Sequence, residues 1–119
     1  MRQKKITEEE FIEKYKKYKQ REVFYKMNGK STRNNILVSK FLKFTSNNSN
    51  EPFFSHALYI LMNDDDPDVR VAAASDSLRN NYHRDFAIEL LRKEANSEDY
   101  KLSSLTAEIV LDINHVSKK

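Results

Sequence analysis

The residues that could carry out catalysis are carboxylates and serines, and neither occurs in a pattern that catalysis requires. Two carboxylates facing each other across a groove could act as general acid and base. The candidates for such a pair are Asp76, Asp85, Glu89, Glu94 and Glu108. Helix surfaces also carry carboxylates for solubility, and the serines lack the flanking glycines of a nucleophile elbow. The sequence therefore predicts a protein that is not an enzyme.

The sequence has few residues that could bind a metal ion or a cofactor. The chain has no cysteine, which excludes thiolate ligands and disulfide bonds. Its histidines, His56, His83 and His115, are far apart and include no i, i+4 pair on one helix face. A single glycine leaves no material for a phosphate-binding loop. We therefore expect neither a metal ion nor a cofactor.

The densest cluster of charge is an acidic turn around Pro67, formed by Asp64, Asp65, Asp66 and Asp68. A calcium loop needs a glycine at its turn and a distal bidentate glutamate, and neither is present here. We expect one aspartate to cap the helix that Pro67 opens, with the others favoured at the positive end of that helix. The same carboxylates could also contact a basic partner.

The N-terminal region mixes aromatic and cationic side chains, a combination that single-stranded nucleic acid favours. Tyr15, Tyr18 and Tyr25 alternate with lysines and Arg21. The tyrosines share one helical stripe with Phe11, which favours burial in a hairpin core. Five glutamates in the same helix weaken its attraction for phosphate. Burial of the tyrosines is therefore the prediction, with nucleic-acid binding kept as the alternative.

Charge divides the chain into two regions of opposite sign. Residues 1–45 hold 13 Lys and Arg against 5 Asp and Glu, giving +8, whereas residues 46–119 hold 8 against 13, giving −5. The modest net charge of +3 hides this separation. A basic region can meet nucleic acid, an anionic membrane or an acidic protein, and an acidic region can meet a basic protein.

Helices are expected to position these residues, because one glycine and two prolines are too few for tight hairpin turns. Apolar residues also recur mostly at helical spacing. We predict one all-α domain over residues 1–119, with helices from after Thr7 to Tyr25, Ser31 to Phe44, Pro52 to the acidic turn, Pro67 to Leu78, Arg84 to Ala95 and Asp99 to Ile113. No apolar run reaches the roughly 18 residues that span a bilayer, which favours a cytoplasmic protein without a membrane partner.

Two further features refine this prediction. Thr7 and Glu10 have the spacing of a capping box, and the polar segment from Thr45 to Asn50 is expected to be a loop or hinge. Besides the tyrosine stripe, the positions expected to be buried are Ile36, Leu37, Phe41, Phe44, Phe54, Ala57, Leu58, Leu61, Phe86, Ala87, Leu90, Leu91, Leu102, Leu105, Ile109 and Ile113.

An internal repeat relates the last two predicted hairpins. A shift of 33 residues places Phe53 on Phe86 and Leu58 on Leu91, and it also aligns the two turns. A period of this length is typical of helical solenoids, in which each hairpin buries its apolar face against a neighbour. We therefore predict stacked antiparallel hairpins, with two repeats in residues 52–113 and a basic N-terminal hairpin in residues 1–45.

The segment from Asp66 to Leu78 resembles a HEAT repeat, with its acidic proline turn, its Val69-Arg70 pair and its run of alanines. The wider run from Phe53 to Leu111 is similar to a small bacterial HEAT-like family of unknown function. The resemblance implies an α-solenoid fragment in which Arg70 pairs with a carboxylate of the adjacent repeat. Members of such families are often encoded beside secreted bacterial toxins, which implies an immunity role.

The leading hypothesis is a cytoplasmic immunity protein that neutralises a cognate bacterial toxin. Its toxin-binding residues are expected to be acidic: Asp64, Asp65, Asp66, Asp68, Asp76, Asp85, Glu89, Glu98 and Asp99. Against an acidic toxin the basic first hairpin would bind instead. The alternative is a nucleic-acid-binding repeat protein whose basic surface comprises Lys14, Lys17, Arg21, Lys30, Arg33, Lys40 and Lys43. An adaptor between housekeeping proteins is a third possibility.

Overall fold

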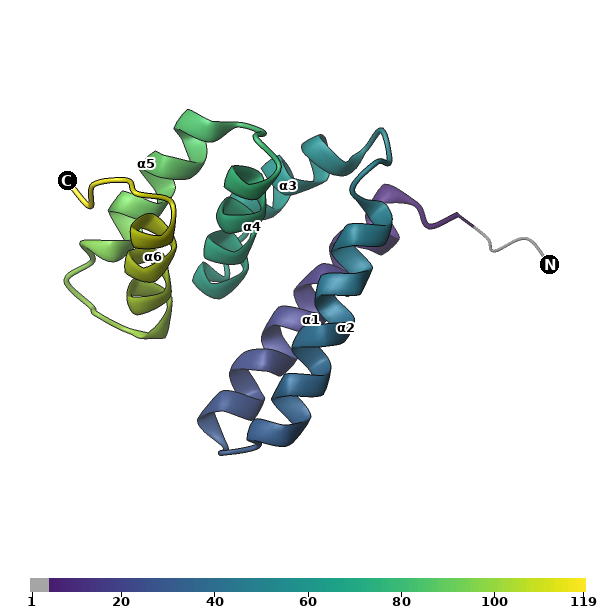
Figure 1. Cartoon of the computed structure of the whole chain (residues 1–119), viewed down its shortest axis with the longest axis horizontal. Coiled ribbons are helices and arrows are strands. Elements are labelled where there is room, and N and C mark those ends of the chain that lie inside the picture. The colour runs from purple at the N-terminus through teal and green to yellow at the C-terminus, as the bar shows by residue number, and fades with distance from the viewer. Residues whose placement is uncertain (1–4) are drawn as a thin grey trace. The chain divides into compact units, whose positions relative to one another are not determined.

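The computed structural model describes residues 5–119, and the described residues form six α-helices and no strand (Figure 1). The helices are α1 (Glu8–Met27), α2 (Ser31–Asn48), α3 (Phe54–Met62), α4 (Pro67–Arg79), α5 (Arg84–Ala95) and α6 (Leu102–Ile113). The prediction of an all-α fold with six helices is confirmed.

Most predicted boundaries agree with the structure, and the capping box is confirmed. The Thr7 hydroxyl accepts the Glu10 N–H at 3.1 Å, while the Glu10 carboxylate accepts the Thr7 N–H at 3.0 Å. The start of α4 at Pro67 and both ends of α5 are as predicted. Two starts lie later than predicted, since α3 begins at Phe54 and α6 at Leu102.

The prediction of a loop over Thr45 to Asn50 is wrong for its first four residues, because α2 continues to Asn48. Thr45 is buried, and its hydroxyl donates to the Leu42 carbonyl at 3.1 Å. Asn48 donates its side-chain N–H to the Phe44 carbonyl at 2.8 Å. These polar side chains satisfy helix carbonyls instead of breaking the helix, which composition alone did not reveal.

An asparagine stands at the C-terminal end of every helix. In each case its side-chain amide donates to the carbonyl four residues earlier, at 2.8 Å. The six residues are Asn28, Asn48, Asn63, Asn80, Asn96 and Asn114. At Asn28, Asn80, Asn96 and Asn114 the same carbonyl also accepts the backbone N–H of the asparagine, so the amide adds a second hydrogen bond to it. The asparagines thus reinforce the helix ends in a chain with almost no glycine to end helices in the usual way.

The chain divides into two compact units, residues 1–57 and 58–119. In the first unit α1 packs on α2 around aromatic rings. The Phe11 ring stacks on Phe44 with centroids 5.0 Å apart, and it lies 5.6 Å from Phe54. Tyr15 meets Phe41 edge-on at 4.9 Å. Burial of Phe11 and Tyr15 is confirmed, whereas Tyr18 and Tyr25 are only half-buried.

In the second unit α4 packs on α5 and α6, and α5 packs on α6. The core is aliphatic, and its fully buried side chains include Leu58, Leu61, Val69, Ala74, Ala87, Leu91, Ala107 and Leu111. The buried Ser77 hydroxyl lies 3.6 Å from the Met62 sulfur.

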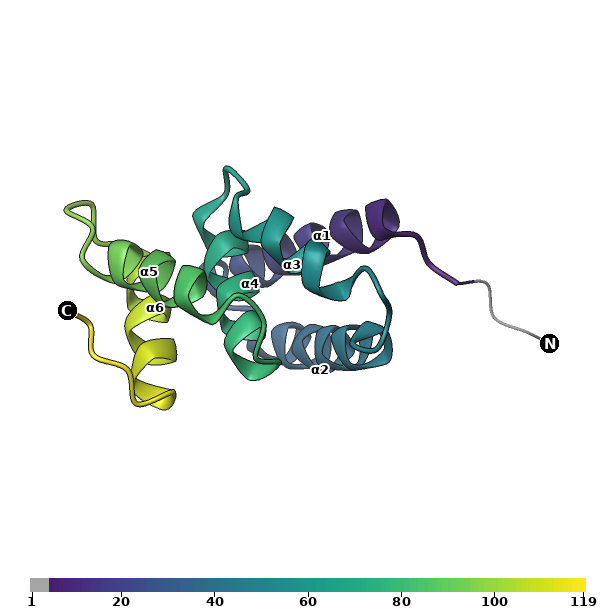
Figure 2. The ribbon, with the colours of Figure 1, turned by 90° about the horizontal axis from the view of Figure 1, so that it is seen from above.

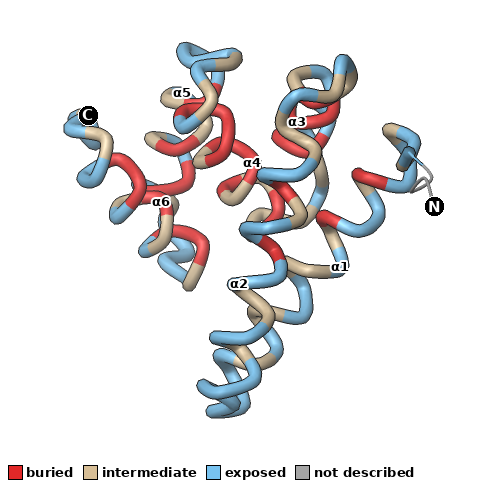
Figure 3. Tube along the Cα trace, turned by 45° about the vertical axis from the view of Figure 1, so that its right-hand side comes forward, coloured by how far each residue is buried: buried red, intermediate tan, exposed pale blue. Residues whose placement is uncertain are grey.

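Several apolar residues expected in the core are exposed instead. They are Ile36, with 54% of its surface accessible, and Phe86, Leu105, Ile109 and Ile113. Ile36 lies on the side of α2 away from Phe41 and Thr45, which are the buried residues of that helix. Figure 3 shows exposed and buried segments alternating along α6, and these three residues are among the exposed ones.

Candidate functional site

The acidic turn between α3 and α4 is held by hydrogen bonds. The Asp66 carboxylate accepts the Asp68 N–H at 2.9 Å and caps α4, as expected for one of the aspartates. The Asp64 carboxylate accepts the Asp66 N–H at 3.0 Å. Arg70 donates to the carbonyl oxygens of Asp64 and Asp65 at 2.9 and 3.0 Å. These hydrogen bonds hold the backbone of the turn in place.

Arg70 also connects this turn to the next hairpin. Its guanidinium lies 3.5 Å from the Glu94 carboxylate in α5, which confirms the predicted pair between adjacent repeats. Glu94 is buried, with 9% of its surface accessible, and it accepts the Ser103 hydroxyl of α6 at 2.7 Å. One carboxylate thus joins α4, α5 and α6. A buried charge with two hydrogen-bond partners is a structural element of the fold, because losing either partner leaves it unsatisfied.

A hollow of about 570 Å³ lies beside the turn. Its lining residues are Met62, Asn63, Asp64, Asp65, Arg70, Phe86, Glu89, Leu90, Lys93 and Glu94. Two of its lining residues, Asp65 on the turn and Glu89 on α5, are exposed carboxylates. The lining also has apolar Met62, Phe86 and Leu90 and the cations Arg70 and Lys93. The exposed carboxylates and apolar groups suit a side chain with both apolar and cationic parts, such as arginine or lysine.

Two more predicted carboxylates lie along the same edge of this unit. Glu98 and Asp99 are exposed in the loop between α5 and α6, and this loop is on the same side of the unit as the α3–α4 turn (Figure 2). The 33-residue repeat explains this placement, because equivalent loops of stacked hairpins share an edge. We name the exposed carboxylates of this edge, Asp65, Glu89, Glu98 and Asp99, the acidic edge.

The structure separates other predicted residues from the acidic edge. Asp76 is only 4% exposed and pairs with Arg79 at 3.0 Å, so the fold uses this carboxylate internally. Asp66 and Asp68 belong to the helix cap. Asp85 is exposed in the first turn of α5 but does not line the hollow. Sequence alone gave all nine carboxylates equal weight, because it does not show which ones the fold uses internally.

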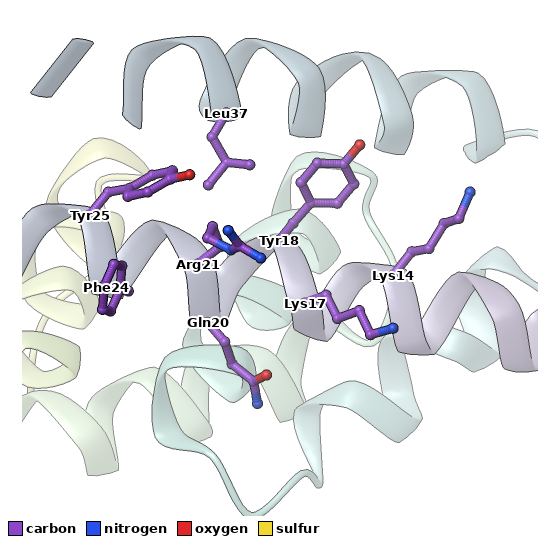
Figure 4. A pocket seen from close by; sticks show the side chains of 8 residues that line it. All are labelled: Lys14, Lys17, Tyr18, Gln20, Arg21, Phe24, Tyr25 and Leu37. Carbon is purple, nitrogen blue, oxygen red and sulfur yellow. The ribbon is translucent and has the colours of Figure 1, made fainter. Parts of the chain in front are cut away.

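A second hollow, of about 720 Å³, lies on the basic first unit. Figure 4 shows Lys14, Lys17 and Arg21 on successive turns of α1, beside the rings of Tyr18, Phe24 and Tyr25 and beside Leu37 of α2. None of the three cations forms an ion pair with a carboxylate among residues 5–119. We name these three the basic ridge. Their spacing of three and four residues places them on one side of the helix.

The glutamates of α1 are mostly engaged elsewhere. Glu22 pairs with Lys19 at 2.8 Å and with Lys26 at 3.7 Å, and the Glu8 carboxylate lies 2.7 Å from His56 Nδ1. Glu10 completes the capping box. The glutamates therefore offset the basic ridge less than their number indicates. The other predicted basic residues, Lys30, Arg33, Lys40 and Lys43, do not line the hollow.

Sequence reasoning missed one cluster, formed by Tyr100, Glu108 and Lys118. The Glu108 carboxylate accepts the Tyr100 hydroxyl at 2.8 Å and the Lys118 ammonium at 2.7 Å. The hydrogen bond from Lys118 lowers the pKa of Glu108, and the same bond raises the pKa of Lys118. The bond to Glu108 raises the pKa of Tyr100. Tyr100 and Lys118 lie outside α6, so helical spacing could not have indicated this cluster.

The C-terminal residues are further fixed by backbone contacts. The Ser117 carbonyl accepts Arg92 Nε, and the Lys118 carbonyl accepts the Asn96 amide, both at 2.9 Å. Together with the Glu108 bond they hold residues 117–118 against α5 and α6. The cluster and these backbone contacts together tether the C-terminal residues.

Comparison with known proteins identifies no relative, so a functional assignment depends on the geometry described above. No family model matches the chain, and neither a curated protein nor a solved structure shows significant similarity to it. Among the described residues, no three histidines or carboxylates form a group that could hold a metal ion. No described helix has the length and apolar character needed to cross a membrane.

Proposed function

We propose that this protein is a non-enzymatic binding module that neutralises a basic bacterial toxin by covering its charged surface. The observation that carries this proposal is the acidic edge. Its carboxylates Asp65 and Glu89 line a hollow with apolar parts, and Glu98 and Asp99 are exposed in the loop between α5 and α6. The toxin's cationic side chains, which would otherwise contact phosphate, would bind these carboxylates instead. The HEAT-like resemblance supports the toxin as partner and the bacterial cytoplasm as the location.

The rigidity of the acidic turn also supports this role. A surface that is already ordered loses little conformational entropy on binding, and its charges accelerate association. Asp64, Asp66 and Arg70 fix the turn before any partner arrives. Asp65, Glu89 and Glu98 then remain as exposed carboxylates without a described side-chain partner, and they are suited to steering a basic protein.

Affinity capture from a lysate of the source organism tests the proposal. The baits are the wild type, an edge variant (Asp65→Asn, Glu89→Gln, Glu98→Gln) and a control variant (Glu9→Gln, Glu13→Gln, Glu51→Gln) with the same change in net charge. We expect the wild type and the control to retain one basic protein after nuclease treatment, and the edge variant to lose it.

The captured protein is then produced in a bacterial host, alone and together with each variant. Growth arrest that the wild type and the control relieve, but the edge variant does not, supports immunity. A captured protein that is harmless to the host identifies an adaptor instead. If the edge variant retains the partner as well as the wild type does, the acidic edge is not the binding surface.

A second function, binding of single-stranded nucleic acid, is favoured by the basic ridge. Three cations without a described ion pair lie beside three aromatic rings, and backbone phosphates and stacked bases use such groups together. A fluorescent single-stranded oligonucleotide is the probe, titrated at several salt concentrations. Binding by this ridge predicts a slope of log affinity against log salt of about −0.7 for each phosphate neutralised.

The matched variants for this test are Lys14→Gln, Lys17→Gln, Arg21→Gln and, as a control, Lys30→Gln, Arg33→Gln, Lys40→Gln. Both remove three positive charges from the same unit. If the ridge binds the oligonucleotide, only the first triple variant loses affinity and flattens the salt slope. Equal losses in both variants indicate non-specific attraction to a basic surface.

A further inference from the structure

The outer face of α6 carries an apolar stripe, Leu102, Leu105, Ile109 and Ile113, at intervals of three and four residues. Leu102 is half-buried, and the other three have 44%, 48% and 70% of their surface exposed. No other described helix exposes three large aliphatic side chains. Contiguous apolar surface of this kind marks an interaction site.

The internal repeat shows that the same face is covered one hairpin earlier. The 33-residue shift places Leu102 on Val69, Leu105 on Ala72 and Ile109 on Asp76. Val69 and Asp76 are buried and Ala72 is half-buried, whereas Leu102 is half-buried and Leu105 and Ile109 are exposed. The stripe is therefore the α6 counterpart of a packed face in α4, so its geometry suits another helix.

The charges at the two ends of α6 indicate which helix packs on the stripe. Lys101 stands at the N-cap and Asp112 in the last turn, and both are exposed. Both oppose the helix dipole, which favours acids at the N-terminus and bases at the C-terminus. Interactions within α6 do not explain these two charges. If an identical helix packs antiparallel on α6, Lys101 of each helix lies near Asp112 of the other.

We propose that the stripe binds the α6 stripe of a second copy of this chain, antiparallel and about a two-fold axis. Such an interface is self-complementary, as two-fold dimers require. With the axis at residue 107, Leu105 lies opposite Ile109 of the second copy. Lys101 is then six residues before the axis and Asp112 five residues after it, so the opposite charges are offset by about 1.5 Å along the helix.

The remaining charges near this face are compatible with such a dimer. Glu108 is bound by Lys118 and Tyr100 of its own chain, so it adds no unpaired acid beside Asp112. The stripe itself holds no charged residue. This dimer is independent of the proposed toxin, since α6 does not contribute to the acidic edge.

Sedimentation velocity over a concentration series tests the proposal on the full chain. The wild type is expected to convert from monomer to dimer as its concentration rises. Ile109→Glu should abolish the dimer, whereas Ile36→Glu, which changes a comparably exposed isoleucine on α2, should preserve it. Circular dichroism verifies that both variants fold. A wild type that remains monomeric up to about 1 mM, the weak end of association, overturns the proposal, as does a dimer that survives Ile109→Glu.

A charge swap tests the antiparallel arrangement. Lys101→Glu and Asp112→Lys each place like charges opposite each other twice per dimer, and each is expected to weaken dimerisation about tenfold. The double variant exchanges the two charges and should restore the wild-type dissociation constant. Failure of the double variant to recover dimerisation, or single variants without effect, contradicts this arrangement.

Discussion

At the scale of single residues, the structure separates carboxylates that hold the fold from those that face solvent. Glu94 and Glu89 lie one and a half helical turns apart on α5 and both line the same hollow. Glu94 is buried between Arg70 and Ser103, whereas Glu89 is exposed and has no described partner. Glu94 shares the buried face of α5 with Ala87 and Leu91, and its carboxylate is satisfied there by the neighbours that the fold supplies.

We expect Glu94→Ala to destabilise the protein by about 1–3 kcal/mol, because Ser103 loses a buried hydrogen-bond partner and Arg70 loses its ion pair. Chemical denaturation followed by circular dichroism measures the free energy of unfolding. Glu89→Ala is the matched control, and its effect should stay within about 0.5 kcal/mol. Equal effects of the two substitutions would show that the Arg70–Glu94–Ser103 contacts contribute nothing.

The Glu108 cluster predicts a pH-dependent tether of the C-terminal residues. The folded-state pKa of Glu108 is lowered, so its contribution is present above the pKa of the unfolded chain and is lost as pH falls through the lowered folded value. NMR relaxation of the Ser117 and Lys118 amides should show these residues becoming mobile on acidification. Glu108→Gln should give the mobile state already at neutral pH. Continued order in that variant would assign the tether to Arg92 and Asn96 alone.

The same bonds predict a second transition in alkali. The folded pKa values of Tyr100 and Lys118 are raised, so their contributions are complete below the unfolded-state values and disappear as pH rises through the raised folded values. The tether is therefore expected to be ordered between the acidic transition of Glu108 and the alkaline transition of its two partners. Ultraviolet absorbance of tyrosinate measures the deprotonation of tyrosine during the alkaline transition.

At the scale of elements, helix ends are determined by local side chains. The asparagine at each C-terminus bonds the carbonyl four residues earlier, and Thr7 and Asp66 cap α1 and α4. These contacts span two to four residues, so the local sequence is sufficient to predict them. The extension of α2 through Thr45 to Asn48 follows the same chemistry, although those residue types also occur in loops.

The turn between α1 and α2 depends on Gly29, the single glycine of the chain. Its φ of +66° lies in the left-handed region, and a Cβ added there meets no atom within 4 Å. Gly29→Ala should therefore cost about 1 kcal/mol through backbone strain alone, measured by chemical denaturation. Gly29→Asn should cost less, because asparagine tolerates this conformation. A neutral Gly29→Ala would show that the turn can adopt another geometry.

At the scale of the whole molecule, charge is distributed between the two units. Residues 1–57 hold 13 basic and 6 acidic side chains, and residues 58–119 hold 8 and 12. The net charge of +3 is therefore the difference between +7 and −4. Partners respond to local fields, since charges farther apart than about 10 Å are largely screened at moderate salt.

Ion-exchange retention should therefore follow the basic ridge and not the net charge. Reversal of Lys14, Lys17 and Arg21 to Glu should abolish retention on a cation exchanger at pH 7. The control reverses Arg84, Lys93 and Lys119 to Glu, with the same change in net charge, and should keep most of the retention. Identical elution of both variants would mean that net charge governs binding.

The sequence by itself determined the helices, their caps and the charge separation, because these depend on residues within about four positions or on composition. It also indicated the 33-residue repeat, and the resemblance to a HEAT repeat implied the Arg70 ion pair. It did not determine burial in α6: Leu105, Ile109 and Ile113 have the spacing of a core face but lie exposed. Helical periodicity identifies an apolar face without identifying what covers it.

Only the tertiary structure decided which charged residues form a site. Asp76 and Asp65 differ by 11 positions in one acidic region, yet the first is buried against Arg79 and the second faces solvent beside Glu89. The Tyr100–Glu108–Lys118 cluster and the hollow beside Lys14, Lys17 and Arg21 likewise depend on contacts between different elements. Local spacing determines where a side chain lies on its own helix, and packing between helices determines whether that side chain is free to bind a partner.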